Sequence, residues 1–81
     1  SDLFSIHPNP TSGNTVFTIE TDDINGLEMI VTDLNGRVVK VIDVDAKRTE
    51  HQLEFRNNGV YLVHLVYNNE IQSTKKLIYA K

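Results

Sequence analysis

Three histidines and eleven acidic residues are the side chains in this sequence that could bind a metal ion or transfer a proton. His7, His51 and His64 lie far apart, and none has the close spacing to a second ligand that marks a zinc site. The absence of cysteine excludes a thiolate site, a thiol nucleophile and a disulfide framework. We therefore predict no metal ion and no cofactor, and interpret His51 and His64 as strand residues that point away from the core.

Two acidic turns could place oxygen atoms around a calcium ion. The segment from Asp33 to Gly36 begins like an EF-hand loop, but Arg37 and Val44 stand where that loop requires its fifth and twelfth ligands. A hairpin turn explains the same residues without an ion. The oxygens of the second turn could bind a surface ion only weakly, and acidic turns of this kind are more often simply solvated. Its polar residues are Asp22, Asp23, Asn25 and Glu28.

Catalytic patterns do not occur in this sequence. There is no nucleophile elbow, no serine, histidine and aspartate in a supporting context, no carboxylate pair in apolar surroundings and no glycine-rich phosphate loop. Thr11 and Ser12 belong to a turn. The formal net charge of −3 argues against binding to nucleic acid. We predict that the protein is not an enzyme.

The composition indicates that β-strands position these residues. Val, Ile and Thr make up 23 of the 81 residues, and β-branched side chains favour a pleated surface. No apolar run approaches the roughly 20 residues needed to span a bilayer. Gly, Pro, Asn and Asp interrupt the chain at short intervals, as in antiparallel sandwiches. The expected strands are 3–7, 14–21, 27–33, 37–44, 51–55, 60–67 and 71–80.

The strongest local signal is Asn35-Gly36, which predicts a type I′ turn with positive φ at both central positions. The two strands that flank this turn should be antiparallel neighbours. In the second of them, we expect Val39 and Val41 to face the core and Val38, Lys40 and Ile42 to face away. A second tight hairpin is expected at Asn68-Asn69.

Other strands also have interpretable faces. Phe17 and Ile19 should point inward from residues 14–21, and Leu27, Met29 and Val31 should share one face of the next strand. His51, Leu53 and Phe55 alternate with polar residues in the fifth strand. Residues 60–67 are almost continuously apolar, which is typical of a strand covered on both faces or flanked by a partner. Together these patterns predict an all-β fold, a seven-stranded antiparallel immunoglobulin-like β-sandwich.

Four motifs occur in order along this predicted sandwich. They are Pro-Asn-Pro-Thr-Ser-Gly at 8–13, Asp-Leu-Asn-Gly-Arg at 33–37, Gly-Val-Tyr at 59–61 and a lysine-rich end at 75–81. In this order they closely resemble the type A C-terminal sorting domain of cargo proteins of the type IX secretion system of Bacteroidetes. The resemblance implies one domain over residues 1–81, with an entry strand and Pro-Asn-Pro loop at 1–13 and the sandwich body at 14–81.

The resemblance implies a non-catalytic secretion signal that directs a cargo protein across the outer membrane. It implies removal by a sortase-like peptidase at the cell surface, with the cut upstream of the Pro-Asn-Pro segment and close to Ser1. The expected partners are the translocon and outer-membrane shuttle or sortase-like components, without nucleic acid or membrane insertion. The expected locations are the periplasm in transit and then the cell surface or the medium. A homodimer through edge-strand pairing of the last strand stays an open alternative, as does a retained immunoglobulin-like adhesion or carbohydrate-binding module.

The residues that match the family motifs are the predicted signal and recognition residues. The glycines should hold turns that a Cβ would disfavour, and Tyr61 should bury its ring while its hydroxyl stays hydrogen-bonded. The last two strands are the expected contact with the machinery, although lysines on an edge strand also discourage unwanted pairing. The full set is Pro8, Asn9, Pro10, Gly13, Asp33, Gly36, Arg37, Gly59, Tyr61, Lys75, Lys76 and Lys81.

Overall fold

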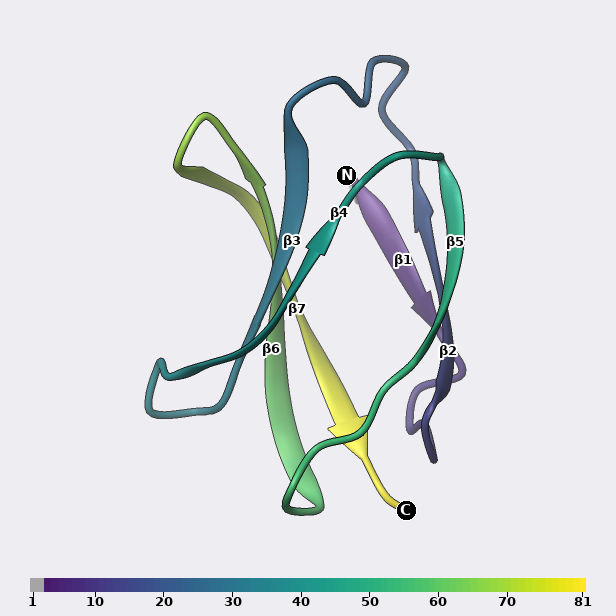
Figure 1. Cartoon of the computed structure of the whole chain (residues 1–81), viewed down its shortest axis with the longest axis vertical. Helices are drawn as coiled ribbons and strands as arrows, with labels where there is room; N and C mark the ends of the chain where they lie inside the picture. Colours follow the sequence, from purple (N-terminus) through teal and green to yellow (C-terminus); the bar gives the residue numbers. More distant parts are fainter. Residues whose placement is uncertain (1–2) are drawn as a thin grey trace.

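The computed structural model describes residues 3–81, and these residues form seven strands in two antiparallel sheets and no helix (Figure 1). One sheet has the strand order β1-β2-β5 and the other has the order β4-β3-β6-β7. The predicted all-β immunoglobulin-like sandwich is confirmed. No helix in residues 3–81 is long and apolar enough to cross a membrane. The strands are β1 (Phe4–His7), β2 (Asn14–Ile19), β3 (Leu27–Thr32), β4 (Val38–Asp43), β5 (Arg48–Gln52), β6 (Gly59–Tyr67) and β7 (Glu70–Tyr79).

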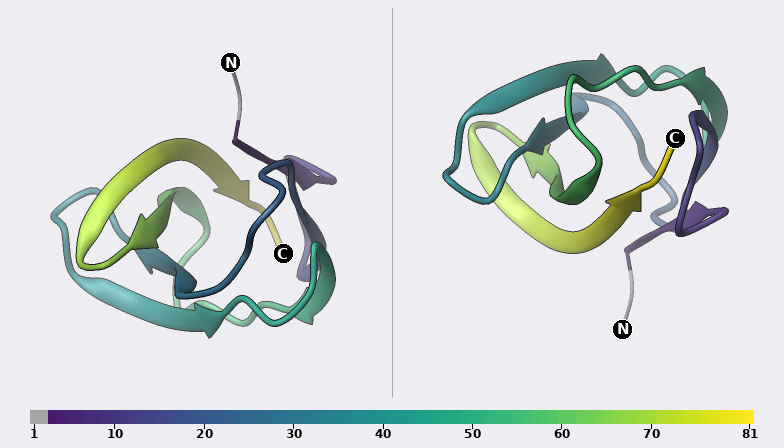
Figure 2. Two further views of the ribbon diagram at one scale, coloured as in Figure 1. Left: turned by 90° about the horizontal axis from the view of Figure 1, so that it is seen from above. Right: turned by 90° about the horizontal axis from the view of Figure 1, so that it is seen from below.

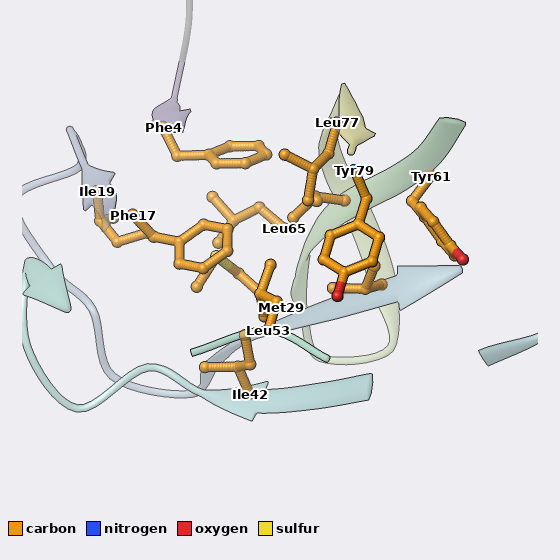
Figure 3. Packing of buried hydrophobic residues seen from close by; sticks show 12 residues of the cluster. Phe4, Phe17, Ile19, Met29, Ile42, Leu53, Tyr61, Leu65, Leu77 and Tyr79 are labelled. Atoms are coloured by element: carbon orange, nitrogen blue, oxygen red, sulfur yellow. The ribbon is translucent and has the colours of Figure 1, made fainter. Parts of the chain in front are cut away.

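The core lies between the two sheets, where alternate side chains of each strand meet (Figure 3). Phe17 and Ile19 are buried, as their spacing predicts, and Met29 and Val31 pack against them from the other sheet. The aromatic rings of Phe55, Tyr61 and Tyr79 form a second group at one end of this core. This packing fixes which face of each strand is exposed.

The inward face of β4 is opposite to the prediction. Ile42 is only 3% exposed, whereas Val41 is 53% exposed, and Val39 is exposed as well. Residues directly opposite one another in an antiparallel pair share a face, and Ile42 lies opposite the buried Met29. The pairing of β3 with β4 shifts between Val31 and Thr32, which leaves one extra residue in β4 and changes the alternation predicted from the turn.

The antiparallel hairpin of β3 and β4 is confirmed, but its predicted type I′ turn is wrong. Only Gly36 has a positive φ, at 86°, and Asn35 does not. The Gly36 amide donates to the carbonyl of Asp33 at 3.1 Å, and the Asp33 amide donates to the carbonyl of Arg37 at 3.0 Å. The hairpin with positive φ at both central residues is instead the one between β6 and β7, where Asn68 has 53° and Asn69 has 66°.

The fifth strand begins earlier than predicted. β5 runs from Arg48 to Gln52 and pairs with β2, so it starts three residues before the predicted strand at 51–55. The alternation at 51–55 does mark a buried residue, Leu53, but that residue follows the strand. Its amide donates to the carbonyl of Gly13 at 2.9 Å. Polar side chains are tolerated in β5 because alternate residues face the outside of the sheet. The outward orientation predicted for His51 is wrong, because it lies opposite the buried Thr15 and its ring centroid is 5.9 Å from that of Phe17.

Candidate functional site

The motif-bearing loops gather at one end of the sandwich (Figure 1). The β1–β2 loop, the β3–β4 hairpin, the β5–β6 loop and the C-terminus all lie at the lower end in this view, whereas the β6–β7 hairpin and the β2–β3 connection lie at the upper end. Segments that are widely separated in the sequence therefore lie at the same end of the sandwich as the last residues of β7. We call this region the motif end.

Asn9 binds the exposed edge of β7 with its side chain. Its Nδ2 donates to the carbonyl of Lys76 at 2.8 Å, and its Oδ1 accepts the amide of Ile78 at 2.9 Å. The side-chain amide thus supplies both a donor and an acceptor to the edge, as a strand backbone would. The flanking Pro8 and Pro10 have no amide hydrogen to contribute. The Pro-Asn-Pro motif therefore covers an edge that would otherwise be open to pairing.

Thr11 continues this contact with its backbone. Its amide donates to the carbonyl of Ile78 at 2.9 Å, and its carbonyl accepts the amide of Ala80 at 2.8 Å. These bonds form an isolated parallel bridge between Thr11 and Tyr79, which joins the β1–β2 loop to the other sheet. Figure 2 shows the end of the chain lying beside this loop in both views. The contact closes one side of the sandwich.

Gly13 completes the first motif with a conformation that suits glycine. Its φ is 146°, and a Cβ at this position would collide with the side-chain amide of Gln52. Its amide donates to the Thr11 hydroxyl at 3.1 Å, and that hydroxyl lies 2.8 Å from the hydroxyl of Thr15. The loop between β1 and β2 is therefore held by buried hydrogen bonds, which positions Asn9 and Thr11 against β7.

A second asparagine holds the last residue of the chain. The Lys81 amide donates to Oδ1 of Asn58 at 3.0 Å, and Nδ2 of Asn58 donates to the Lys81 carbonyl at 3.5 Å. Next to it, the Tyr61 hydroxyl donates to the carbonyl of Asn57 at 2.5 Å, while the ring of Tyr61 is buried. This arrangement corresponds to the tyrosine corner of immunoglobulin-like sandwiches, in which a tyrosine near the start of a strand bonds the preceding turn.

The β3–β4 hairpin forms a groove of about 550 Å³ with the β5–β6 loop. Asp33 and Arg37 contribute one wall, and Gly59 and Tyr61 contribute the other. Oδ1 of Asp33 accepts the amides of Asn35 and Arg37, each at 2.9 Å. The Arg37 amide is the main cause that lowers the pKa of the Asp33 carboxyl group, and the Arg37 guanidinium, with Nε 3.2 Å from Oδ2, lowers it further.

The three predicted lysines occupy different environments. Lys76 lies opposite Leu62 on the outward side of β7 and is exposed, and Lys81 is exposed at the motif end. Lys75 lies opposite the buried Val63 and is half-buried. The predicted residues thus form two adjacent groups, one around the end of β7 and one in the groove, which meet at Asn58.

Sequence reasoning did not select Thr11 and Asn58 as site residues, although Thr11 bonds the end of β7 and Asn58 bonds Lys81 just after it. A usable signal was the repeated placement of asparagine next to a proline or glycine motif, because the amide side chain can replace a peptide group at a strand edge. No group of three metal-binding side chains occurs within residues 3–81. The hydrogen bonds of Asn9, Thr11 and Asn58 hold the end of the chain against the loops of the motif end.

Comparison with known protein families identifies the family to which the chain is similar. The model of the secretion system C-terminal sorting domain matches residues 5–80, a range that includes every predicted motif residue except Lys81. No curated protein matches the chain with significant similarity. The matched family is that of type IX secretion in Bacteroidetes, and its sorting signal implies export across the outer membrane to the cell surface or the extracellular space. The chain therefore belongs to the family of C-terminal sorting domains of type IX secretion.

Proposed function

We propose that residues 1–81 act as a non-catalytic sorting domain that the secretion machinery recognises as a folded shape, with the motif end as a contact surface. The observation that carries this proposal is the binding of β7 and the two residues after it by Asn9, Thr11 and Asn58. A linear tag would leave its motif side chains available to a receptor. Here the amide of Asn9 is used within the domain to position the last strand.

The exposed lysines give the motif end a basic character within a chain of net charge −3. Lys76 lies on β7, whose backbone is held by β6 on one side and by Asn9 on the other, and Lys81 follows the strand and is held by Asn58. Such preorganisation lowers the entropy lost when a partner binds. An acidic surface on the translocon or on an outer-membrane shuttle is the complementary partner that we propose.

We further propose that a sortase-like peptidase removes the domain by a cut on the N-terminal side of Leu3. Phe4 is fully buried in the core and begins β1, which pairs with β2 through four residues. A cut within β1 would remove Phe4 from the core or detach its strand, whereas a cut before Leu3 leaves the sandwich intact. The cargo would then leave without the folded signal.

A fusion of residues 1–81 to the C-terminus of a periplasmic reporter tests the proposal in a bacterium with a type IX system. We expect the reporter at the surface or in the medium, and intact masses that place the cut before Leu3. Deletion of residues 76–81 should abolish export. Because this deletion also removes the buried Leu77 and Tyr79, the double variant Lys76→Ala, Lys81→Ala provides the surface-specific test.

The matched control is the double variant Lys47→Ala, Arg48→Ala, which removes the same charge from two exposed residues at the other end, the last of the β4–β5 connection and the first of β5. The control should be exported like the wild type, whereas the lysine variant of the motif end should be exported several-fold less. Normal export of the fusion lacking residues 76–81, or of the Lys76 and Lys81 variant, would contradict recognition of the motif end.

The alternative of a retained carbohydrate-binding module is not favoured by the aromatic side chains. Tyr61 and Tyr79 are buried and contact Phe55, so their rings cannot form a platform for a sugar. Among the three tyrosines, Tyr67 is the one that is largely exposed, at 51%. The same intact-mass measurement separates the two functions, because a retained module would still be present in the mature protein.

A further inference from the structure

The outer faces of the two sheets differ sharply in polarity. On the three-stranded sheet, Phe4, Phe17 and Ile19 point into the core, so the alternate residues point outward. These outward residues are almost all polar, as expected for a solvated face. They include Ser5, Asn14, Thr18, Arg48, Glu50 and Gln52.

The outer face of the four-stranded sheet is largely apolar. Met29, Val31, Val63 and Leu65 are fully buried on the inner side, so their neighbours along β3 and β6 point away from the core. We call the resulting surface the outer apolar face. It includes Ile30, Val41, Leu62 and Ile71, and Val66 points to the same side but is only 5% exposed. This arrangement explains why β6 is apolar at nearly every position.

The polar side chains in the middle of this face bond one another. Nε2 of His64 lies 3.0 Å from the Thr32 hydroxyl, and Nδ1 of His64 lies 2.8 Å from the Thr74 hydroxyl. A polar group can be buried at low cost only when it keeps its hydrogen bonds. Both ring nitrogens of His64 already have partners, so a covering surface could exclude water from this imidazole without leaving either nitrogen unpaired.

A shallow hollow of about 330 Å³ lies in the outer apolar face. Its lining includes Ile30, Leu34, Leu62 and Ile71, with His64 among them. Leu34 comes from the β3–β4 hairpin, so the face extends towards the motif end. A hollow of this size accommodates a few apolar side chains of a partner.

Charges flank the apolar residues at opposite corners. Glu28 and Asp43 are opposite one another on β3 and β4, and Lys76 lies across the sheet on β7. All three side chains point away from the core. Glu28 alternates with the buried Met29, Asp43 lies opposite Glu28, and Lys76 lies opposite the outward Leu62. A partner would match this pattern with a basic group at the β4 corner and an acidic group at the β7 corner.

The dimensions of the face are those of a transient interface. Four strands about 4.8 Å apart, with outward residues at intervals of about 6.8 Å, cover roughly 500 Å². Two such surfaces would bury about 1,000 Å², which is near the lower limit for specific complexes. A signal that must be bound and then released fits an interface of this size better than a permanent one.

We propose that the outer apolar face docks on a protein component of the secretion machinery that presents an apolar surface with the complementary charged corners. This inference rests on the proposed function, because a sorting domain must be bound by the machinery that exports its cargo. It adds a second contact, formed by the β4-β3-β6-β7 sheet, to the contact at the motif end. The apolar face supplies affinity, and the charged corners orient the domain.

The reporter fusion tests this docking with the double variant Val41→Lys, Ile71→Lys. Both side chains are more than half exposed, at 53% and 61%, so the substitutions change the surface and not the core. The matched control, Thr18→Lys with Gln52→Lys, adds the same charge to the polar outer face of the other sheet. We expect export to fall about tenfold for the first variant and to stay at the wild-type level for the control.

Circular dichroism and urea unfolding of the purified domains show whether both variants remain folded. If the lysine variant does not fold, Val41→Thr with Ile71→Thr keeps the β-branched shape while removing apolar surface. Wild-type export by a folded face variant would overturn the docking proposal and leave the sorting function intact. Failure of the wild-type fusion to be exported would instead refute the proposed function itself.

Two further measurements address other occupants of the face. Sedimentation equilibrium of the purified domain tests a second copy, and flotation with vesicles of phosphatidylethanolamine and phosphatidylglycerol tests a membrane. A monomer that does not bind these vesicles supports the machinery as the occupant. A dimer or a vesicle complex that the lysine variant abolishes would overturn this assignment.

Discussion

Two tyrosines at the motif end differ in one atom's environment. The hydroxyl of Tyr61 donates to the carbonyl of Asn57, whereas the hydroxyl of Tyr79 is buried without a hydrogen-bond partner in the described chain. Both rings pack against Phe55, and Tyr79 is only 1% exposed. Figure 3 shows Tyr61 and Tyr79 beside one another in the core cluster. The phenol hydroxyl therefore stabilises the fold at Tyr61, whereas at Tyr79 its burial without a partner costs free energy.

Replacing each tyrosine with phenylalanine should separate these effects. Tyr61→Phe should reduce the free energy of unfolding by about 1 kcal/mol, because it leaves the Asn57 carbonyl without this donor. Tyr79→Phe should leave stability unchanged or raise it, because it removes an unsatisfied buried hydroxyl. Urea unfolding of the two variants tests the prediction, and a larger loss for Tyr79→Phe would contradict it.

At the scale of the elements, the position of β7 depends on contacts from two loops. The bonds from Asn9 join residues 67 and 69 positions apart in the sequence, and those from Asn58 join residues 23 positions apart. Both asparagines bind backbone atoms, so the identity of the β7 side chains does not decide these contacts. The motif loops thus hold the end of the chain through hydrogen bonds to its backbone.

Asn9→Ala should destabilise the domain more than Asn58→Ala. The first substitution removes two hydrogen bonds of 2.8 and 2.9 Å, whereas the second removes one of 3.0 Å and a long one of 3.5 Å. We expect a loss of about 1 kcal/mol for Asn9→Ala, since water can partly replace exposed bonds. Amide hydrogen exchange of Ile78 should accelerate in this variant, and equal protection in the wild type and the variant would refute the contact.

The β3–β4 hairpin carries a pH-dependent element. Backbone amides, chiefly that of Arg37, stabilise the ionised carboxylate of Asp33 and lower its pKa below the ordinary value. A group whose pKa is lowered by folding binds its proton more readily in the unfolded chain. Its contribution to stability is therefore complete above the unfolded pKa of about 4 and is lost as the pH falls through the lowered folded value.

A comparison of the wild type with Asp33→Asn should reveal this dependence. At neutral pH the wild type should be the more stable of the two, because its carboxylate accepts two backbone amides and pairs with Arg37. Below about pH 4 the difference should shrink as the carboxyl group becomes protonated. Urea midpoints of both proteins across this range measure the effect, and a constant difference would exclude Asp33 as its source.

At the scale of the whole molecule, the core is the element on which every exposed surface depends. A domain of this length is expected to have a free energy of unfolding of about 4–12 kcal/mol. Phe17 is fully buried between the two sheets, with its ring centroid 5.9 Å from that of His51. The placement of both the motif end and the outer apolar face requires this packing.

Phe17→Ala should therefore impair export without altering either surface. The substitution should cost about 3–5 kcal/mol, which approaches the whole stability of a small domain. Phe17→Leu keeps most of the apolar volume and should be exported nearly normally. Measuring reporter export beside circular dichroism tests recognition of the folded shape, and normal export of an unfolded Phe17→Ala domain would show that a linear sequence is sufficient.

The sequence alone determined the features that depend on a few neighbouring residues. Alternation in residues 14–21 identified the inward Phe17 and Ile19, and the turn residues located both hairpins. The four ordered motifs identified the family, which the match over residues 5–80 confirms. These features were accessible because strand periodicity and turn preference are local properties of the chain.

Tertiary structure alone decided the features that depend on register and on distant pairing. The extra residue in β4 turned Ile42 inward and Val41 outward, and pairing with β2 made a strand of the polar residues from Arg48. The contacts of Asn9 with β7 and of Asn58 with Lys81 could not be predicted, because each asparagine bonds backbone atoms that only the folded chain brings within reach. Local periodicity divides the residues of a strand into two alternating sets, but the hydrogen bonds between distant strands decide which of the two sets faces the core.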